Sequence, residues 1–199
     1  MSEKYVPTFT LNDGVEMPAV GLGTWQMQGD EVITAVRSAI DTGYRHIDTA
    51  AFYQNETDIG RAIHDAISAG DVTREELFIT SKVWNDQQSD HEVQAAFRAS
   101  LTNLGLDYLD CYMVHWPCPS TGRHVERFAA LGTLQGLGDV RSIAVANYNG
   151  DQLREVQEKT SIVPTINQVE LHPGFSQAEL RETHAQLGVL TEAWSPLAQ

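Results

Sequence analysis

Cysteine, basic residues and long apolar runs are scarce in this sequence. Cys111 and Cys118 are its only cysteines, and 13 basic residues stand against 27 acidic residues, which gives a net charge of −14. Because the acidic residues are scattered, we interpret them as a solvated surface and expect neither nucleic acid nor an anionic membrane as a partner. No apolar run is long enough to span a bilayer, and no signal peptide is recognisable. We therefore expect two free thiols in a reducing cytoplasm.

The fingerprints of several common sites are also missing. Gly21-Leu-Gly-Thr-Trp lacks the third glycine of a dinucleotide-binding turn, and neither a P-loop nor a serine nucleophile elbow is present. Six histidines lack metal-ligand spacing, so we interpret them as structural or surface residues and predict no metal site: His46, His64, His91, His124, His172 and His184.

Apolar strands alternate with amphipathic helices along the chain. Strands are expected at 18–23, 45–49, 77–81, 109–114, 140–145, 165–169 and 189–193, after a hairpin over 9–20. This alternation predicts an α/β fold with parallel strands, and the spacing favours a single (β/α)₈ barrel domain over 1–199, with an open doubly wound sheet as the alternative. Only seven strands are visible, so we expect the barrel to lack its last helix-strand-helix unit, about 60 residues.

Capping residues set the expected helix boundaries. Asp30 and Asn55 are predicted to cap the first two helices, and capping boxes at Ser89–Glu92 and Ser176–Glu179 are predicted to begin the third and sixth. The fourth helix, about 123–137, is expected to be weak because it contains Gly132 and Gly136.

Functional side chains stand where three of the expected strands end. Asp48 lies at the end of the strand at 45–49, Lys82 follows 77–81 and His115 follows 109–114, while Tyr53 lies in the loop after the first of these strands. Consecutive βα units usually place their strands side by side, so these groups are expected to share one rim of the barrel.

An Asp–Lys–Tyr–His group is suited to carbonyl reduction. Asp48 would hold Lys82 charged, and the ammonium would lower the pKa of Tyr53 so that it donates a proton to a developing alkoxide. His115 would orient the carbonyl oxygen. A cofactor has to supply the hydride. Taken singly, the Asp48–Lys82 pair has a structural explanation as an ion pair, His115 as a core histidine and Tyr53 as a packing residue.

Six motifs together resemble the aldo-keto reductase family, nearest to its bacterial diketogluconate-reductase-like branch. They are Gly21-Leu-Gly-Thr-Trp, Gly43-Tyr-Arg-His-Ile-Asp-Thr-Ala, Phe78-Ile-Thr-Ser-Lys-Val-Trp-Asn, Asp110-Cys-Tyr-Met-Val-His-Trp-Pro, Asn167-Gln-Val-Glu-Leu-His-Pro and Ala193-Trp-Ser-Pro-Leu. The resemblance implies a (β/α)₈ barrel that reduces aldehydes and ketones with NADPH, with NADH as the other possible cofactor. It also implies a proton donor at Tyr53, tuned by Lys82 and Asp48, and a substrate-orienting His115.

The resemblance also implies a cofactor site and a substrate pocket. Asn147 and Gln168 match residues that hold the nicotinamide carboxamide, Trp194 matches the aromatic that stacks on the ring, and Ser195 and Leu197 match positions that touch the diphosphate. Thr24 is a further cofactor-binding candidate. Trp25, Trp84 and Trp116 follow strand ends and are expected to line an apolar substrate pocket beside His115, with rim packing as the alternative.

Two departures from the family pattern bear on activity. Ala144-Val-Ala-Asn-Tyr148 stands where the family usually has Gly-Val-Ser-Asn-Phe, so Ala146 removes a hydroxyl that would bind the carboxamide, worth about 1 kcal/mol. The family's lysine and arginine that clamp the adenosine phosphate follow strand 8, beyond the seven strands visible here.

A complete barrel would be monomeric, whereas an open one leaves strand edges that favour self-association. The sequence thus leaves two hypotheses, a small-molecule carbonyl reductase or a non-catalytic relic that binds a partner or itself.

Overall fold

Seven parallel strands, hydrogen-bonded in sequence order, form the wall of a barrel in the computed structural model, which describes residues 7–198. They are β3 (Gly21–Gly23), β4 (His46–Asp48), β5 (Phe78–Val83), β6 (Leu109–Val114), β7 (Val140–Ala146), β8 (Ile166–Glu170) and β9 (Leu190–Trp194). β3 and β9 are the two edges of this sheet in the described part of the chain. The predicted parallel barrel architecture is confirmed.

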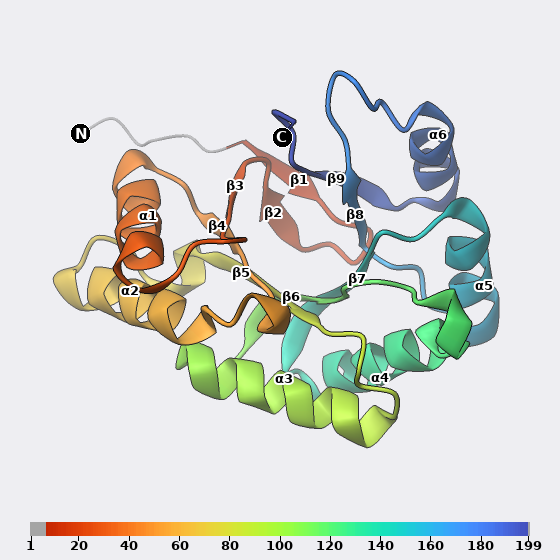
Figure 1. Ribbon diagram of the computed structural model, residues 1–199, viewed down its shortest axis with the longest axis horizontal. Helices are drawn as coiled ribbons and strands as arrows, with labels where there is room; N and C mark the ends of the chain where they lie inside the picture. Colours follow the sequence, from red (N-terminus) through yellow and green to blue (C-terminus); the bar gives the residue numbers. More distant parts are fainter. Residues whose placement is uncertain (1–6, 199) are drawn as a thin grey trace.

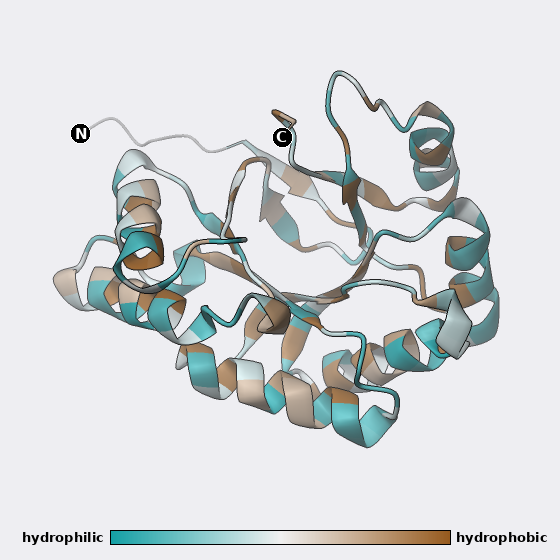
Figure 2. Ribbon diagram, in the orientation of Figure 1, coloured by the Kyte–Doolittle hydropathy of each residue, from teal (hydrophilic) through white to brown (hydrophobic). Residues whose placement is uncertain are grey.

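Six α-helices surround the strands on the outside (Figure 1). They are α1 (Gly29–Thr42), α2 (Glu56–Ala69), α3 (Asp90–Leu104), α4 (His124–Leu137), α5 (Gly150–Thr160) and α6 (Ala178–Leu187), with short 3₁₀ turns η1 (Ala51–Tyr53), η2 (Arg74–Glu76) and η3 (Pro119–Thr121). Their apolar sides face the strands and their polar sides face outward (Figure 2). Over residues 7–198, none of these helices is long and apolar enough to cross a membrane.

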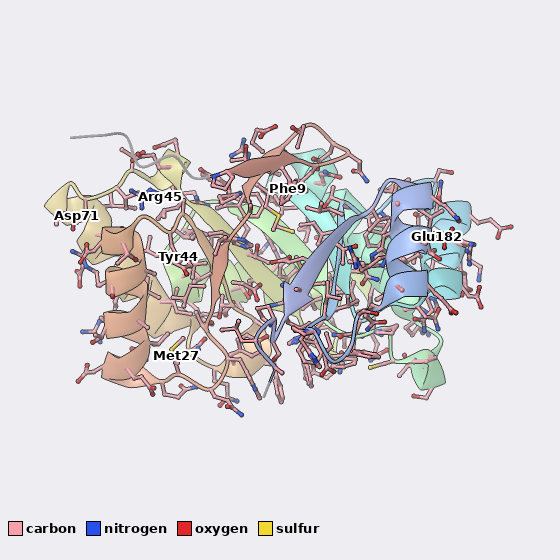
Figure 3. All side chains as sticks on the ribbon, turned by 90° about the horizontal axis from the view of Figure 1, so that it is seen from above. Phe9, Met27, Tyr44, Arg45, Asp71 and Glu182 are labelled. Atoms are coloured by element: carbon pink, nitrogen blue, oxygen red, sulfur yellow. The ribbon has the colours of Figure 1, made fainter. Side chains whose placement is uncertain are left out.

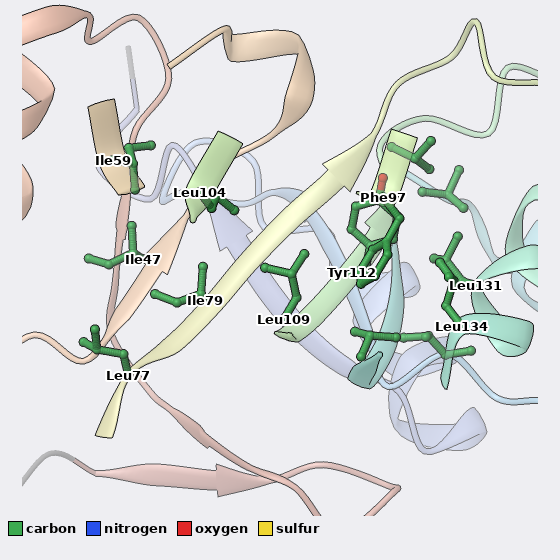
Figure 4. Close-up of a cluster of buried hydrophobic side chains, with 14 of the residues drawn as sticks. Ile47, Ile59, Leu77, Ile79, Phe97, Leu104, Leu109, Tyr112, Leu131 and Leu134 are labelled. Carbon is green, nitrogen blue, oxygen red and sulfur yellow. The ribbon is translucent and has the colours of Figure 1, made fainter. Parts of the chain in front are cut away.

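The core lies between the helices and the strands. Ile47, Ile79 and Tyr112 project outward from three successive strands and meet α2, α3 and α4 side chains such as Phe97 and Leu131 (Figure 4). All five side chains are fully buried. Because every second residue of a strand faces this layer, the intervening residues, which include Asp48 and Lys82, face the inside of the barrel.

An antiparallel hairpin of β1 (Thr8–Thr10) and β2 (Glu16–Pro18) lies at the end of the barrel where the strands begin. Its turn is tied to the wall because the Asn12 amide donates to the carbonyl oxygens of Pro164 and Gly188, at 3.1 and 3.0 Å. Leu11 and Met17 pack against a second cluster of apolar residues inside that end. In Figure 3 the hairpin, marked by Phe9, lies apart from the helical layer that carries Glu182. The hairpin leaves the opposite rim, where the strands end, free to form a site.

Most helix boundaries agree with the predictions, and three details do not. α1 begins at Gly29 after Gln28, with Asp30 inside its first turn, and α6 begins after Gln177 without the capping box predicted at Ser176. Asn55 does occupy the N-cap position of α2, but its side chain makes no capping bond there. In each case a tertiary contact or a left-handed residue set the boundary instead of a local cap. For α1, the backbone N–H of Gly29 donates to the Asp58 carboxylate at 3.2 Å.

The glycine-containing helix α4 forms over nearly the predicted range. A Cβ at Gly132 would lie 2.9 Å from the Ile162 Cδ1 atom. A side chain at this position would displace the end of the Ile162 side chain, so glycine allows α4 to pack closely against that residue.

Candidate active site

A buried ion pair joins the ends of β4 and β5. The Lys82 Nζ atom lies 2.7 Å from both Asp48 carboxylate oxygens and 3.0 Å from the Thr49 carbonyl oxygen. The Lys82 side chain is fully buried and that of Asp48 is 13% exposed. Burial lowers the pKa of Lys82, but Asp48 and Tyr53 raise it by more, so the net direction is upward. The ammonium therefore remains charged inside the barrel.

Tyr53 lies beside this pair, at the end of η1. Its hydroxyl oxygen accepts a hydrogen bond from Lys82 Nζ at 3.5 Å, and its carbonyl oxygen accepts one from the Gln28 amide at 2.8 Å. The Lys82 charge lowers the pKa of Tyr53, as expected, but it does not set the net direction. Burial of the ring raises this pKa, and the lowering by Lys82 does not offset it. Tyr53 is consequently a protonated donor at neutral pH.

His115 follows β6 and faces the same space as Tyr53. The two ring centroids are 5.6 Å apart at 75°, and the imidazole is 8% exposed. Burial, with a further contribution from the Lys82 charge, lowers the pKa of His115 to about 3. Its Nδ1 atom is buried without a hydrogen-bond partner in the structure. A neutral imidazole with a free nitrogen is equipped to orient a carbonyl group.

An aromatic stack stands over the rim next to His115. Phe52 lies between Trp84, at 3.7 Å between ring centroids, and Trp25, at 5.7 Å, and both pairs are nearly parallel. Trp25 and Phe52 are 46% and 43% exposed, and Trp116, the residue after His115, is 40% exposed. Phe52 belongs to this wall although the sequence reasoning omitted it. Its signal was its position directly before Tyr53.

The candidates for the nicotinamide site lie on the three neighbouring strands β7, β8 and β9. Ala146 is paired with Gln168 and Gln168 with Glu192, and the Asn147 backbone N–H donates to the Gln168 carbonyl oxygen at 2.9 Å. The Asn147 side chain donates to the His115 carbonyl oxygen at 3.0 Å and accepts from the Trp194 indole N–H at 2.9 Å. Asn147 thus links His115 to Trp194, the tryptophan expected to stack on the ring.

The remaining cofactor candidates fall into two groups. Thr24 is fully buried, and its hydroxyl donates to the Asp48 carbonyl oxygen at 3.0 Å, so it already fixes the strand that carries Asp48. Ser195 and Leu197 follow β9 in a turn, where the Ala198 N–H donates to the Ser195 carbonyl oxygen at 2.9 Å. Leu197 is 94% exposed.

Asn55 ties the loops of the site together. Its side chain accepts from the Thr49 hydroxyl at 3.0 Å and donates to the carbonyl oxygens of Thr24 and Met27, at 2.8 and 3.0 Å. Because Asn55 follows η1 by two residues, this network anchors the turn that presents Tyr53. A buried amide with three partners is a positioning element that a capping pattern does not reveal.

The match to a known family covers nearly the whole chain. The aldo/keto reductase family model matches residues 19–199. This chain belongs to the aldo/keto reductase family. The predicted resemblance is therefore confirmed, and the strands and helices described above are the family's barrel architecture.

Individual relatives agree with the family match. An aldo-keto reductase of Mycolicibacterium smegmatis is 49% identical over 193 residues, 97% of this chain and 69% of the relative. The 2,5-diketo-D-gluconic acid reductase B of Corynebacterium is 43% identical over 194 residues, 98% of this chain and 69% of the relative. A crystal structure of a Bombyx mori aldo-keto reductase in complex with NADP superposes with a TM-score of 0.90 at 41% identity, over 96% of this chain and 66% of that one. The chain thus spans about two thirds of the length of these reductases.

Proposed function

We propose that this chain reduces an aldehyde or ketone to an alcohol with NADPH as hydride donor and Tyr53 as proton donor. One observation carries the proposal: the Lys82 ammonium, fully buried, contacts both Asp48 oxygens at 2.7 Å and the Tyr53 hydroxyl at 3.5 Å. Burying an ion pair is costly and adds little to stability. A buried pair that also contacts a tyrosine hydroxyl, at the end of the barrel where the strands end, is therefore better explained by a role in catalysis.

The roles of the four residues follow from this geometry. In the reduction, the carbonyl oxygen gains negative charge as its carbon accepts the hydride, and the Tyr53 O–H gives it a proton. The phenolate left on Tyr53 is stabilised by the Lys82 charge, which Asp48 holds in place. The neutral His115 ring donates a hydrogen bond that orients the carbonyl group.

The nicotinamide ligands fit the end of the barrel formed by β7, β8 and β9. NADPH would supply the hydride when bound. Gln168 is 4% exposed and lies next to Asn147 in the sheet register, and Trp194 is held against Asn147 by its indole N–H. The Bombyx mori aldo-keto reductase that was crystallised with NADP superposes on 96% of this chain. These contacts support Asn147 and Gln168 as carboxamide ligands and Trp194 as the stacking ring.

The walls of the pocket favour a small carbonyl compound. Trp25, Phe52 and Trp84 offer apolar faces beside His115, while Lys82 is buried beneath Tyr53. Small aldehydes, α-keto compounds and keto sugars suit such a pocket, and the reductase relative from Corynebacterium makes 2,5-diketo-D-gluconate the first compound to try.

The cofactor site is tested by titrating NADPH and following tryptophan fluorescence. The wild-type chain is expected to show saturable quenching, and Trp194→Phe to lose most of that quenching while Trp116→Phe retains it. Equal loss of quenching in both variants would show that the nicotinamide does not stack on Trp194. No saturation by wild type at millimolar NADPH would contradict the proposed cofactor.

A further inference from the structure

A second carboxylate faces the inside of the barrel from β9. The Thr191 hydroxyl shares a hydrogen bond of 2.8 Å with the Nδ1 atom of His184 in α6, so Thr191 faces the outer helical layer. Neighbouring strand residues point to opposite faces, which turns Glu192 toward the inside. Glu192 Oε2 is buried and has no hydrogen-bond partner in the structure.

Glu192 shares this space with the groups of the reaction. Gln168 of β8 is its register partner, and the Gln168 side chain, acting as a donor, lowers the pKa of Glu192. Its charge interacts with Asp48 of β4 and Lys82 of β5. It also interacts with Tyr53 of η1 and with Cys111 of β6. Glu192 therefore interacts electrostatically with residues of five other elements.

The single cation inside this group is already committed. Lys82 directs its N–H groups to the two Asp48 oxygens, to the Thr49 carbonyl oxygen and to the Tyr53 hydroxyl. No ammonium proton remains to pair with Glu192. Burial, followed by the negative charge of Asp48, raises the pKa of Glu192 to about 8, and the opposing effects of Lys82 and Gln168 are smaller. The unpaired carboxyl accordingly holds its proton at neutral pH.

We infer that Glu192 is a further positioning residue of the reductase site, which holds the Gln168 amide and, as a neutral acid, keeps a second negative charge away from Tyr53 and the nicotinamide. This inference rests on the proposed function. If the NH₂ group of Gln168 faces Glu192, its amide oxygen is the group that would accept a hydrogen bond from a carboxamide. Nothing in the pattern of active-site motifs assigns a role to Glu192.

Ionisation of Glu192 would change the preference between the two forms of the cofactor. The oxidised nicotinamide ring is positively charged and the reduced ring is neutral. A carboxylate at this position therefore favours NADP⁺ over NADPH, and the neutral acid removes that bias. We expect the ratio of the NADPH and NADP⁺ dissociation constants to shift toward NADP⁺ by on the order of tenfold as the pH rises from 7 to 9.

The ionisation itself is measured without cofactor, by carbon NMR of protein labelled at the glutamate side-chain carboxyls. We expect one wild-type signal to titrate near pH 8 and to be absent from Glu192→Gln. Glu182→Gln, on the outer layer of α6 (Figure 3), is the matched control and should keep that signal. A wild-type spectrum in which every glutamate titrates below pH 6 would overturn the inference, even if NADPH binds.

The positioning role is read from cofactor affinity in two variants. At pH 7, Glu192→Gln keeps a hydrogen-bonding group for Gln168 and should bind NADPH within about twofold of wild type, while Glu192→Ala should bind it roughly five- to tenfold more weakly. Glu192→Gln should also lose the pH-dependent shift toward NADP⁺. Equal affinities in both variants would contradict a positioning role. Failure of wild type to bind either cofactor form would overturn the proposed function, whereas the NMR titration would still decide the ionisation of Glu192.

Discussion

Replacing Lys82 by methionine should leave Asp48 as an uncompensated charge inside the barrel. The ammonium is fully buried and the carboxylate is 13% exposed, so little water reaches either group. Removing one partner of a buried pair costs about 3–5 kcal/mol, because the remaining charge keeps its desolvation penalty and loses its attraction. We expect the free energy of unfolding of Lys82→Met to fall by this amount at pH 7.

A second substitution separates the charge effect from the loss of packing. Adding Asp48→Asn to Lys82→Met removes the uncompensated charge and should restore roughly half or more of the lost stability. The control is Arg154→Met, which breaks the pair of Arg154 with Asp151, where the side chains are 52% and 96% exposed. That change should cost less than about 0.5 kcal/mol.

Urea unfolding followed by circular dichroism gives the four free energies. The reasoning would be refuted by a Lys82→Met variant within 1 kcal/mol of wild type, in the approximate range of an exposed pair. It would equally be refuted by a double variant that is no more stable than Lys82→Met, because the destabilisation would then come from packing and not from charge.

Three further predictions follow from the same contacts. Ala146→Ser restores a hydroxyl next to the nicotinamide ligands and should lower the NADPH dissociation constant about fivefold, which a fluorescence titration measures. Burial lowers the pKa of His46 to about 4, so the contribution of His46 to stability should be full above pH 6.5 and fall as the pH drops toward 4. In acid unfolding curves, His46→Gln should remove about 3 kcal/mol of this pH dependence. An unchanged slope of stability against pH in that variant would contradict the prediction. The raised pKa of Glu192 has the opposite sign, so wild type should lose stability relative to Glu192→Gln as the pH rises from about 4.5 to about 8, and parallel curves over that range would argue against it.

The alternation of apolar strands and amphipathic helices was enough to predict the barrel. Each strand from β4 to β8 carries a run of buried residues, and that pattern depends on local periodicity alone. The positions of Asp48, Lys82 and His115 at strand ends then predicted their convergence, because parallel neighbours share a rim. The ion-pair contacts at 2.7 Å and the 5.6 Å approach of Tyr53 to His115 agree with that expectation.

Other features depend on contacts that periodicity does not encode. Whether burial or Lys82 dominates the pKa of Tyr53 is a balance of two opposing effects, and only the packed structure gives its sign. Asn55 resembled an ordinary helix cap until its three loop contacts were visible. The helix starts near Asp30 and Ser176 were misplaced because a distant carboxylate and a left-handed residue replaced the local capping signals.

Phe52 and Glu192 show two signals that the sequence did contain. Phe52 directly precedes Tyr53, so a loop that presents the tyrosine also presents this ring to the pocket. Glu192 is the one charged residue of its strand, the same anomaly that drew attention to Asp48. A buried acid within a strand is expensive unless it is paired or protonated, and this rule applies to both residues.

The central claim is that Tyr53, supported by Lys82 and Asp48, donates the proton in an NADPH-dependent carbonyl reduction. Its most direct test is the rate of NADPH consumption with 2,5-diketo-D-gluconate and a panel of small aldehydes, for wild type, Tyr53→Phe and the exposed control Tyr44→Phe. The account predicts turnover by wild type and Tyr44→Phe, and a loss of about 10²–10⁴-fold in kcat for Tyr53→Phe. Equal rates in wild type and Tyr53→Phe, or no consumption by wild type with any carbonyl compound, would contradict it.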